Sequence, residues 1–339
     1  MRRRWFRPST VSRSVRSRSL STGRALAVTV AMLVGVGAAA PAFAGTDAGH
    51  PSASSSPSDH GFLRFRLPYL DGIAPAPDFP NLARAAARPA PLLLFLPATG
   101  AVPDDYRAFL ATAAAVGYSV IGLDYPNLGR SVTRTCLGDA KCYTMLQRNR
   151  FTGADPSRFS HVTAANSITN RFRATVHYLE QHDPSGRWGR YLQHGHIDWS
   201  RIVVAGHSQG GGESAFIAHY NRVQGVLMFS SPVESYDNVT ASWIDGKGAT
   251  PVSRMFGFDV LGDIYQDRIA GSWRKLGLGT DHDPVAVPTG GHALLSSLPV
   301  GSPIQTHGRS VDDRTPRGAN GVPVFAPTWR WMLDQVRQP

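Results

Sequence analysis

A serine flanked by two glycines is the strongest chemical signal in this 339-residue sequence. The segment Gly206-His207-Ser208-Gln209-Gly210 follows an apolar run, Arg201–Ala205, and precedes a helix-like stretch, Gly211–Tyr220. A serine in such a strand–turn–helix context can act as a nucleophile, because its hydroxyl projects above the sheet and helix N–H groups face the reacting oxygen. Side chains in place of Gly206 and Gly210 would collide with the neighbouring strand or helix. The pattern therefore predicts nucleophilic catalysis at Ser208 rather than an idle serine in a glycine-rich turn.

The elements that must position Ser208 alternate between short apolar runs and helix-like segments, which is typical of a mostly parallel sheet. Several of the apolar runs are continuous, as in strands that are covered on both faces. The predicted strands are Leu92–Leu96, Tyr118–Leu123, Arg201–Ala205, Gly225–Phe229 and Val252–Phe258. The predicted helices are Asp104–Val116, Val162–Gln181, Gly211–Tyr220 and Thr328–Arg337. The sequence thus predicts an α/β fold.

Around Ser208 the chain resembles the α/β-hydrolase superfamily, in particular its secreted bacterial esterase- and lipase-like serine hydrolases, and the resemblance extends over most of residues 90–339. It implies a mostly parallel central sheet with helices on both faces. In that superfamily the nucleophile is followed by an acid after a later strand and then by a histidine near the C-terminus. The resemblance implies a Ser-His-Asp triad that needs no metal and no organic cofactor.

The two partners of Ser208 follow from that order. We expect the histidine to be His292, because Gly290 and Gly291 let its loop bring the imidazole over the serine; His282, in an acidic loop, is the alternative. Asp263 is favoured as the acid because it lies in the loop after the predicted strand Val252–Phe258. Asp259, directly after that strand, remains the alternative.

The resemblance also implies an oxyanion hole formed by two backbone N–H groups. One is that of Gln209, directly after the nucleophile. The other should come from Leu96-Pro97-Ala98-Thr99-Gly100, where Pro97 stands in place of the histidine that is usual in the superfamily. Because the hole uses main chain, Ala98 or Thr99 can still donate, and we expect Thr99 to do so.

The N-terminal residues predict export. Residues 1–44 contain eight arginines and no acidic residue, followed by an apolar run at 25–40 and by Ala42-Phe43-Ala44, a signal-peptidase pattern. The run is too short and too rich in glycine and alanine to predict a membrane span. Residues 45–60, rich in Ser, Pro and Gly, are expected to form a flexible linker, so that residues 61–339 form the catalytic domain.

Most of the net positive charge of the chain lies in residues 1–44. Subtracting the eight arginines from the formal net charge of +11 leaves only +3 for the rest of the chain. A domain of this size with so small a charge does not predict a nucleic-acid partner.

The segment at residues 127–160 interrupts the alternation of strands and helices. It is expected to be an insertion near the active site, because loops at the carboxyl ends of parallel strands carry specificity. Cys136 and Cys142 both lie in it, and in an exported protein such a pair predicts a disulfide.

These patterns together predict a secreted serine hydrolase that acts on a small-molecule or lipid carboxylic ester. An acyltransferase, a thioesterase or a peptidase could use the same residues on the same fold. A catalytically silent binding protein on the same scaffold is the alternative of another class, although the nucleophile and both glycines are present. The oligomeric state is not predicted by the sequence.

Overall fold

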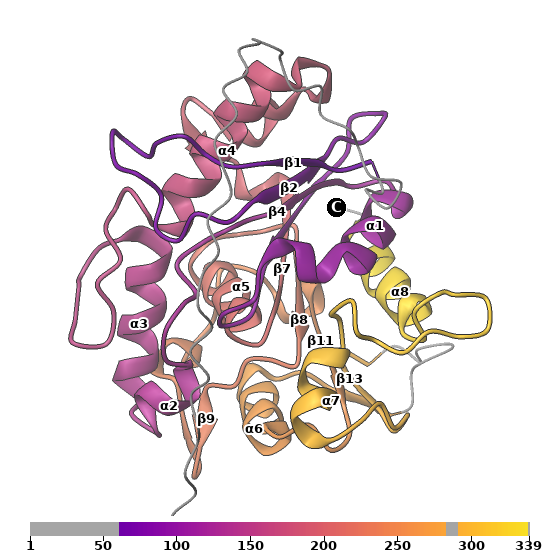
Figure 1. Ribbon diagram of the computed structural model, residues 1–339. Coiled ribbons are helices and arrows are strands. Elements are labelled where there is room, and N and C mark those ends of the chain that lie inside the picture. The colour runs from indigo at the N-terminus through magenta and orange to yellow at the C-terminus, as the bar shows by residue number, and fades with distance from the viewer. Residues whose placement is uncertain (1–60, 283–290, 338–339) are drawn as a thin grey trace, which may run out of the picture. The chain divides into compact units, whose positions relative to one another are not determined.

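A nine-stranded sheet forms the centre of the protein. Its strands lie in the order β1-β2-β4-β3-β7-β8-β11-β13-β12. The computed structural model describes residues 61–282 and 291–337 (Figure 1), and the predicted signal peptide and linker lie outside these residues. The bounds of the nine strands are β1 Leu63–Phe65, β2 Asn81–Arg84, β3 Leu92–Leu96, β4 Ser119–Gly122, β7 Ile202–His207, β8 Gly225–Phe229, β11 Met255–Val260, β12 Thr280–His282 and β13 Ala293–Ser296.

The strands from β4 to β12 in that order are parallel to one another, whereas β2 is antiparallel to both β1 and β4. Strands β3, β4, β7 and β8 are buried along their whole length, which explains their continuous apolar sequences. Because the strands are parallel, their carboxyl ends meet at one edge, and the loops after β3, β7, β11 and β13 gather there.

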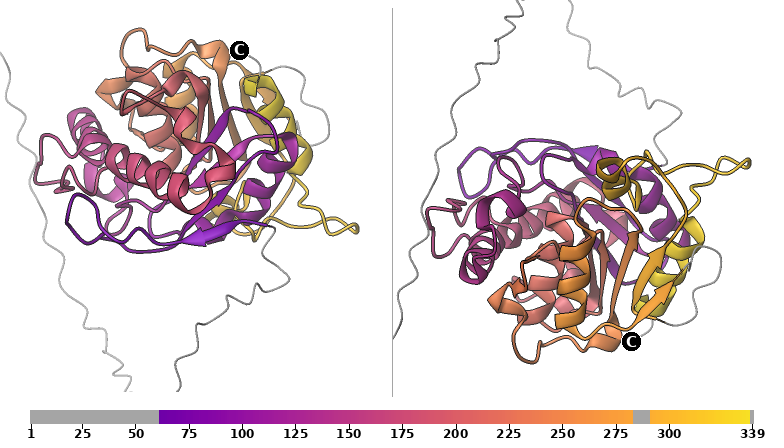
Figure 2. Two further views of the ribbon diagram at one scale, coloured as in Figure 1. Left: turned by 90° about the horizontal axis from the view of Figure 1, so that it is seen from above. Right: turned by 90° about the horizontal axis from the view of Figure 1, so that it is seen from below.

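Helices cover both faces of the sheet (Figures 1 and 2). The described helices are α1 Arg107–Val116, α2 Val132–Cys136, α3 Ala140–Thr152, α4 Ile168–His182, α5 Gln209–Tyr220, α6 Gln266–Leu276, α7 Pro303–Arg309 and α8 Ala326–Arg337. Successive residues of a strand point to opposite faces, so Leu93 and Phe95 of β3 join the core beneath α1 and α8. Leu92, Leu94 and Leu96 join the core beneath α3, α4, α5 and α6.

The predicted mostly parallel α/β architecture is confirmed, and the structure differs locally from the predicted elements. Residues Val252–Arg254 form a single 3-10 turn, so the strand there begins at Met255 and continues to Val260. Ala293–Ser296, for which no strand is predicted, forms the parallel strand β13 beside β11. A strand of four residues gives too short a pattern to be told from a packed loop.

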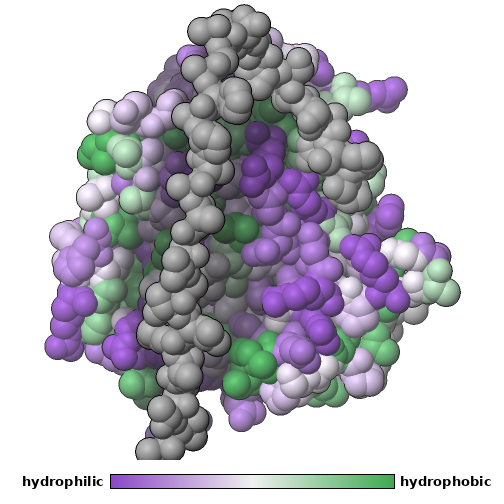
Figure 3. Space-filling model, in the orientation of Figure 1, coloured by the Kyte–Doolittle hydropathy of each residue, from purple (hydrophilic) through white to green (hydrophobic). Residues whose placement is uncertain are grey.

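The face seen in Figure 3 is mainly hydrophilic over α1, and its apolar residues appear in small separate areas. Asp104 forms ion pairs with Arg64 at 3.0 Å and with Arg107 at 2.5 Å. None of the helices within residues 61–282 and 291–337 is long and apolar enough to cross a membrane.

Candidate active site

Ser208 occupies a sharp turn between β7 and α5. Its backbone has φ 52° and ψ −115°, a conformation that L-residues rarely adopt and that costs on the order of 1–3 kcal/mol. The turn is held from both sides, because the Ser208 N–H donates to Phe229 O at 2.9 Å and its carbonyl accepts from the Gly212 N–H at 3.0 Å. The strain is therefore supported by β8 and by the first turn of α5.

The two glycines around Ser208 sit where no side chain fits. A Cβ at Gly206 would lie 2.3 Å from the backbone of Gly210, and one at Gly210 would lie 2.0 Å from Leu96 O. Both distances are far inside van der Waals contact. The close packing of β7, α5 and the end of β3 around Ser208 thus requires glycine at both positions.

His307 and Asp263 continue a hydrogen-bonded chain from Ser208. His307 Nε2 lies 2.8 Å from Ser208 Oγ, and His307 Nδ1 lies 2.7 Å from Asp263 Oδ2. His307 belongs to α7, which follows β13, and Asp263 lies in the loop after β11. With a neutral imidazole protonated at Nδ1, the ring donates to the carboxylate and accepts from the serine hydroxyl. This arrangement can activate a nucleophile.

The surroundings of Asp263 keep its carboxyl ionised. Burial by itself raises the pKa of this group, but the hydrogen bond from His307 and the charge of the imidazolium bring the pKa below its ordinary value. The Tyr265 N–H donates to the same carboxylate at 2.6 Å. An ionised acid at this position can orient the imidazole and stabilise its protonated form.

Asp259, the alternative acid, has a different environment. It is fully buried in β11 and accepts a hydrogen bond from Ser230 Oγ at 3.0 Å. Burial, and after it the negative charge of Asp263, raise the pKa of the Asp259 carboxyl well above its ordinary value. Of the two candidates from the sequence, the structure brings Asp263 to an imidazole.

The expected position of His292 beside Ser208 is corrected by the structure. His292 directly precedes β13, where its Nδ1 lies 2.9 Å from Met255 O and its ring stacks on Phe256 with 4.4 Å between centroids. Met255 begins β11, so His292 lies at the amino ends of the parallel strands, whereas Ser208 lies at their carboxyl ends. His282 ends β12, and its side chain is outside those described.

His307 was missed because Ala293–Ser296 was not recognised as a strand. A histidine in the loop after the last strand must follow residue 296, which leads to Ser302-Pro303-Ile304-Gln305-Thr306-His307. A serine before a proline, with a glutamine three residues on, is a helix-start signal, and Ser302 and Gln305 do form a capping box. That signal could have pointed to a helix bearing His307.

The residues expected to form the oxyanion hole lie against each other. Thr99 Oγ1 donates to Gln209 Oε1 at 2.8 Å, which ties the loop after β3 to the start of α5. The Ala98 N–H donates to the Tyr106 hydroxyl at 3.2 Å, so it is already engaged. For the N–H groups of Thr99 and Gln209, the described part of the chain provides no acceptor. These two N–H groups are therefore available to an oxyanion.

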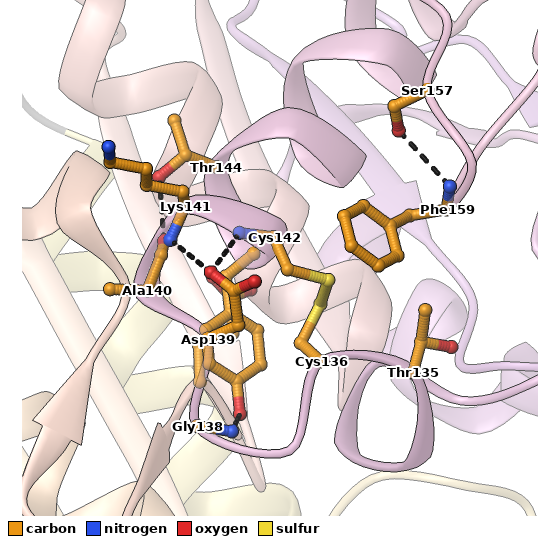
Figure 4. The surroundings of a disulfide bond; sticks show 12 residues. Thr135, Cys136, Gly138, Asp139, Ala140, Lys141, Cys142, Thr144, Ser157 and Phe159 are labelled. Carbon is orange, nitrogen blue, oxygen red and sulfur yellow. Dashed lines mark hydrogen bonds between the residues drawn. A yellow bond between two sulfur atoms is a disulfide. The ribbon is translucent and has the colours of Figure 1, made fainter.

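The predicted disulfide between Cys136 and Cys142 is present (Figure 4). It joins the end of α2 to the first turn of α3. Asp139 caps α3, since its carboxylate accepts from the N–H groups of Lys141 and Cys142, each at 3.0 Å. The segment 127–160 is thus mainly helical, and the bond closes its turn. Within the described residues, no cluster of three or more His, Cys, Asp or Glu is arranged to hold a metal ion.

No protein-family model matches the chain, and no curated protein matches it. Solved structures similar to it include the carboxyl esterase 2 of the mycorrhizal fungus Tuber melanosporum, with 12% identity, coverage of 83% of this chain and 89% of that one, and a TM-score of 0.43. For the esterase LipW of Mycobacterium marinum the identity is 16%, the coverages are 82% and 83%, and the TM-score is 0.42. A bacterial heroin esterase has 16% identity, coverages of 84% and 86%, and a TM-score of 0.41.

The fold is identified by features of this structure. These are the strand order, the single antiparallel strand β2 and the helices on both faces of the sheet. A further feature is the sharp strand-to-helix turn with Ser208 at its apex. A sheet of this order with such a turn at its carboxyl edge is characteristic of one architecture. The chain has the α/β-hydrolase fold.

Proposed function

We propose that this protein is a serine hydrolase that cleaves carboxylic esters through Ser208, His307 and Asp263. The observation that carries the proposal is the continuous hydrogen-bonded chain, with 2.8 Å from Ser208 Oγ to His307 Nε2 and 2.7 Å from His307 Nδ1 to Asp263 Oδ2. Unrelated folds hold the same three groups in the same roles, so the geometry rather than the sequence position carries the chemistry.

In the first half of the reaction, Ser208 Oγ attacks the carbonyl carbon of the ester while its proton moves to His307 Nε2. The carbonyl oxygen becomes an oxyanion, for which the N–H groups of Thr99 and Gln209 are the proposed donors. The C–O bond to the alcohol then breaks, the alcohol leaves with the proton from Nε2, and an acyl-enzyme remains. Asp263 stabilises the imidazolium throughout and takes no proton.

In the second half, water attacks the acyl-enzyme and gives a proton to His307 Nε2. The new tetrahedral intermediate collapses, the bond to Ser208 Oγ breaks, and the proton returns to the serine. The acid product and the free enzyme are restored, so the cycle needs only ester and water.

We propose further that the protein acts outside the cytoplasm, after removal of a signal peptide near Ala44. The pattern of residues 1–44 supports this, and so does the disulfide between Cys136 and Cys142, since such bonds persist in oxidising compartments. The substrate class proposed is a small-molecule or lipid ester.

The test is labelling of the purified protein by a fluorophosphonate probe, together with hydrolysis of p-nitrophenyl esters of increasing acyl length. The expected result is labelling and turnover in the wild type and loss of both in Ser208→Ala. The intact mass after labelling should show one adduct. The masses of the peptides after proteolysis should place it on the peptide that contains Ser208. A folded wild-type protein that neither reacts with the probe nor hydrolyses any ester would contradict the proposal.

A further inference from the structure

A cavity of about 900 Å³ opens beside the loop that follows β4. The cavity has a positive lining: Arg130, Arg150 and Arg158 contribute to it, and none of the described residues that line it is an Asp or Glu. Arg130 and Arg158 are exposed, whereas Arg150 is 5% exposed. The positive charge therefore extends from the surface into the protein.

The Nη1 group of the buried Arg150 has no hydrogen-bond partner in the described part of the chain. The acid that Arg150 approaches is Glu213 of α5, with 4.0 Å between Nη1 and Oε1. Within the described residues, both carboxylate oxygens of Glu213 also lack a hydrogen-bond partner. Burial raises the pKa of the Glu213 carboxyl well above its ordinary value. Since an arginine keeps its charge, a buried positive group is left without a hydrogen-bonded counter-ion.

The cavity is connected to the oxyanion loop by Asn127. The Asn127 Nδ2 group donates to Ala98 O at 2.7 Å and to Ala101 O at 2.8 Å, and its neighbours Pro126 and Leu128 line the cavity. Through Asn127, the wall of the cavity thus contacts the loop that carries Thr99.

Part of the remaining wall of the cavity comes from the segment 127–160. Thr135 and Phe159 both line it, and both belong to the surroundings of the Cys136–Cys142 disulfide drawn in Figure 4. Apolar groups of Leu128, Phe159 and Val162 flank the arginines. An apolar chain that ends in an anion would match both parts of this lining.

We propose that this cavity binds a carboxylate carried by the ester substrate, with Arg150 as its main hydrogen-bond donor. The inference rests on the proposed function and narrows its substrate class to anionic esters. Arginine presents a planar fork of N–H donors that matches a carboxylate. Arg130 and Arg158 attract the anion at the mouth of the cavity.

The test compares anionic esters with neutral esters of matched length. One arm places the carboxylate on the acyl side, with the p-nitrophenyl half-ester of glutaric acid against p-nitrophenyl pentanoate. The other arm places it on the alcohol side, with 4-acetoxybenzoate against its methyl ester. The measured quantity is the ratio of kcat/KM for the anionic ester to that for its neutral partner. The wild type should prefer the anionic ester in at least one arm, and no preference in either arm would overturn the proposal.

Arg150→Gln should lower that ratio about 10- to 100-fold, the effect of losing a charged hydrogen bond, while kcat/KM for the neutral ester changes little. Arg150→Lys should retain part of the preference. The control is Arg148→Gln on the same helix, since Arg148 is half exposed and lies 3.8 Å from Asp155. An equal loss with both esters in Arg150→Gln would mean that Arg150 is structural, and the proposal would be wrong.

Two further measurements keep the result clear if Arg150→Gln does not fold. The double variant Arg130→Gln, Arg158→Gln changes only exposed side chains and should lower the ratio several-fold. Glutarate should bind the Ser208→Ala protein in calorimetry. The absence of such binding would contradict the carboxylate site and would leave the proposed ester hydrolysis unaffected. Glutarate binding together with no ester hydrolysis by the wild type would support the cavity and refute the proposed function.

Discussion

At the residue scale, the contacts of two histidines show which of them is the partner of Ser208. His307 places one ring nitrogen on Ser208 and the other on Asp263, whereas His292 bonds a backbone carbonyl and stacks on Phe256. Both are histidines in the C-terminal quarter of the chain. Only their positions relative to the sheet distinguish them.

His307→Ala should reduce kcat by about 10⁴-fold or more, since the serine loses its base and the imidazolium is absent. His292→Ala should leave kcat within a few-fold of the wild type. Both variants are measured with a short p-nitrophenyl ester under one set of conditions, and circular dichroism shows whether each is folded. If the larger loss occurred in His292→Ala with both proteins folded, the assignment of the base to His307 would have to be abandoned.

At the scale of elements, the catalytic residues depend on how closely α5 approaches the end of β3. Gly210 is in the first turn of α5, and its Cα faces Leu96 O directly. The same approach allows the hydrogen bond from Thr99 to Gln209. The oxyanion loop and the nucleophile turn are thus held together by packing around one glycine.

Gly210→Ala should therefore separate the loop after β3 from α5. A Cβ at 2.0 Å from Leu96 O must displace one of them, and a shift of about 1 Å at the reacting groups costs about 10²-fold in kcat. The overpacking should also lower the free energy of unfolding by about 1–3 kcal/mol. Ester kinetics and urea denaturation measure the two effects.

The matched control is Gly279→Ala, because a Cβ at Gly279 meets none of the described atoms within 4 Å. Its kcat and its stability should stay near those of the wild type. A Gly210→Ala protein with wild-type kcat would show that the contact with Leu96 does not constrain the catalytic residues.

At the scale of the whole molecule, a buried histidine links stability to pH. His207 is 4% exposed, its Nδ1 lies 2.9 Å from the Tyr106 hydroxyl, and its Nε2–H donates to His307 O at 2.9 Å. Burial, and after it the charge of His307, lower the pKa of His207 from 6.5 to about 3. The unfolded chain binds a proton at His207 in this interval, and the folded protein does not.

The free energy of unfolding should consequently fall as the pH is lowered from about 6.5 toward 3, by at most about 1.4 kcal/mol per pH unit for this group. In His207→Gln that contribution disappears, so the difference in stability between variant and wild type should shift in favour of the variant as the pH falls. Urea denaturation at several pH values between 4 and 7 measures it. A difference that does not change with pH would exclude His207 as the titrating group.

Much of the central sheet could be predicted from the sequence because its signals are local. Leu92–Leu96 and Gly225–Phe229 are continuous apolar runs of strand length, and both were predicted with their observed bounds. The short strands β1, β2, β12 and β13 have three or four residues each and were missed. Their pairing with neighbours far along the chain stabilises them, and such pairing leaves little pattern in the sequence.

The turn around Ser208 was determined by the sequence itself, since a strand, two glycines and a helix within about twenty residues leave few other conformations. The partners of Ser208 were decided by the tertiary structure, because His307 lies 99 residues after Ser208 and Asp263 lies 44 residues before His307. The strand order brings the loops after β7, β11 and β13 to one edge of the sheet, and β13 has only four residues. The unpaired donor of Arg150 was also invisible in the sequence, since burial and the absence of a partner are properties of packing.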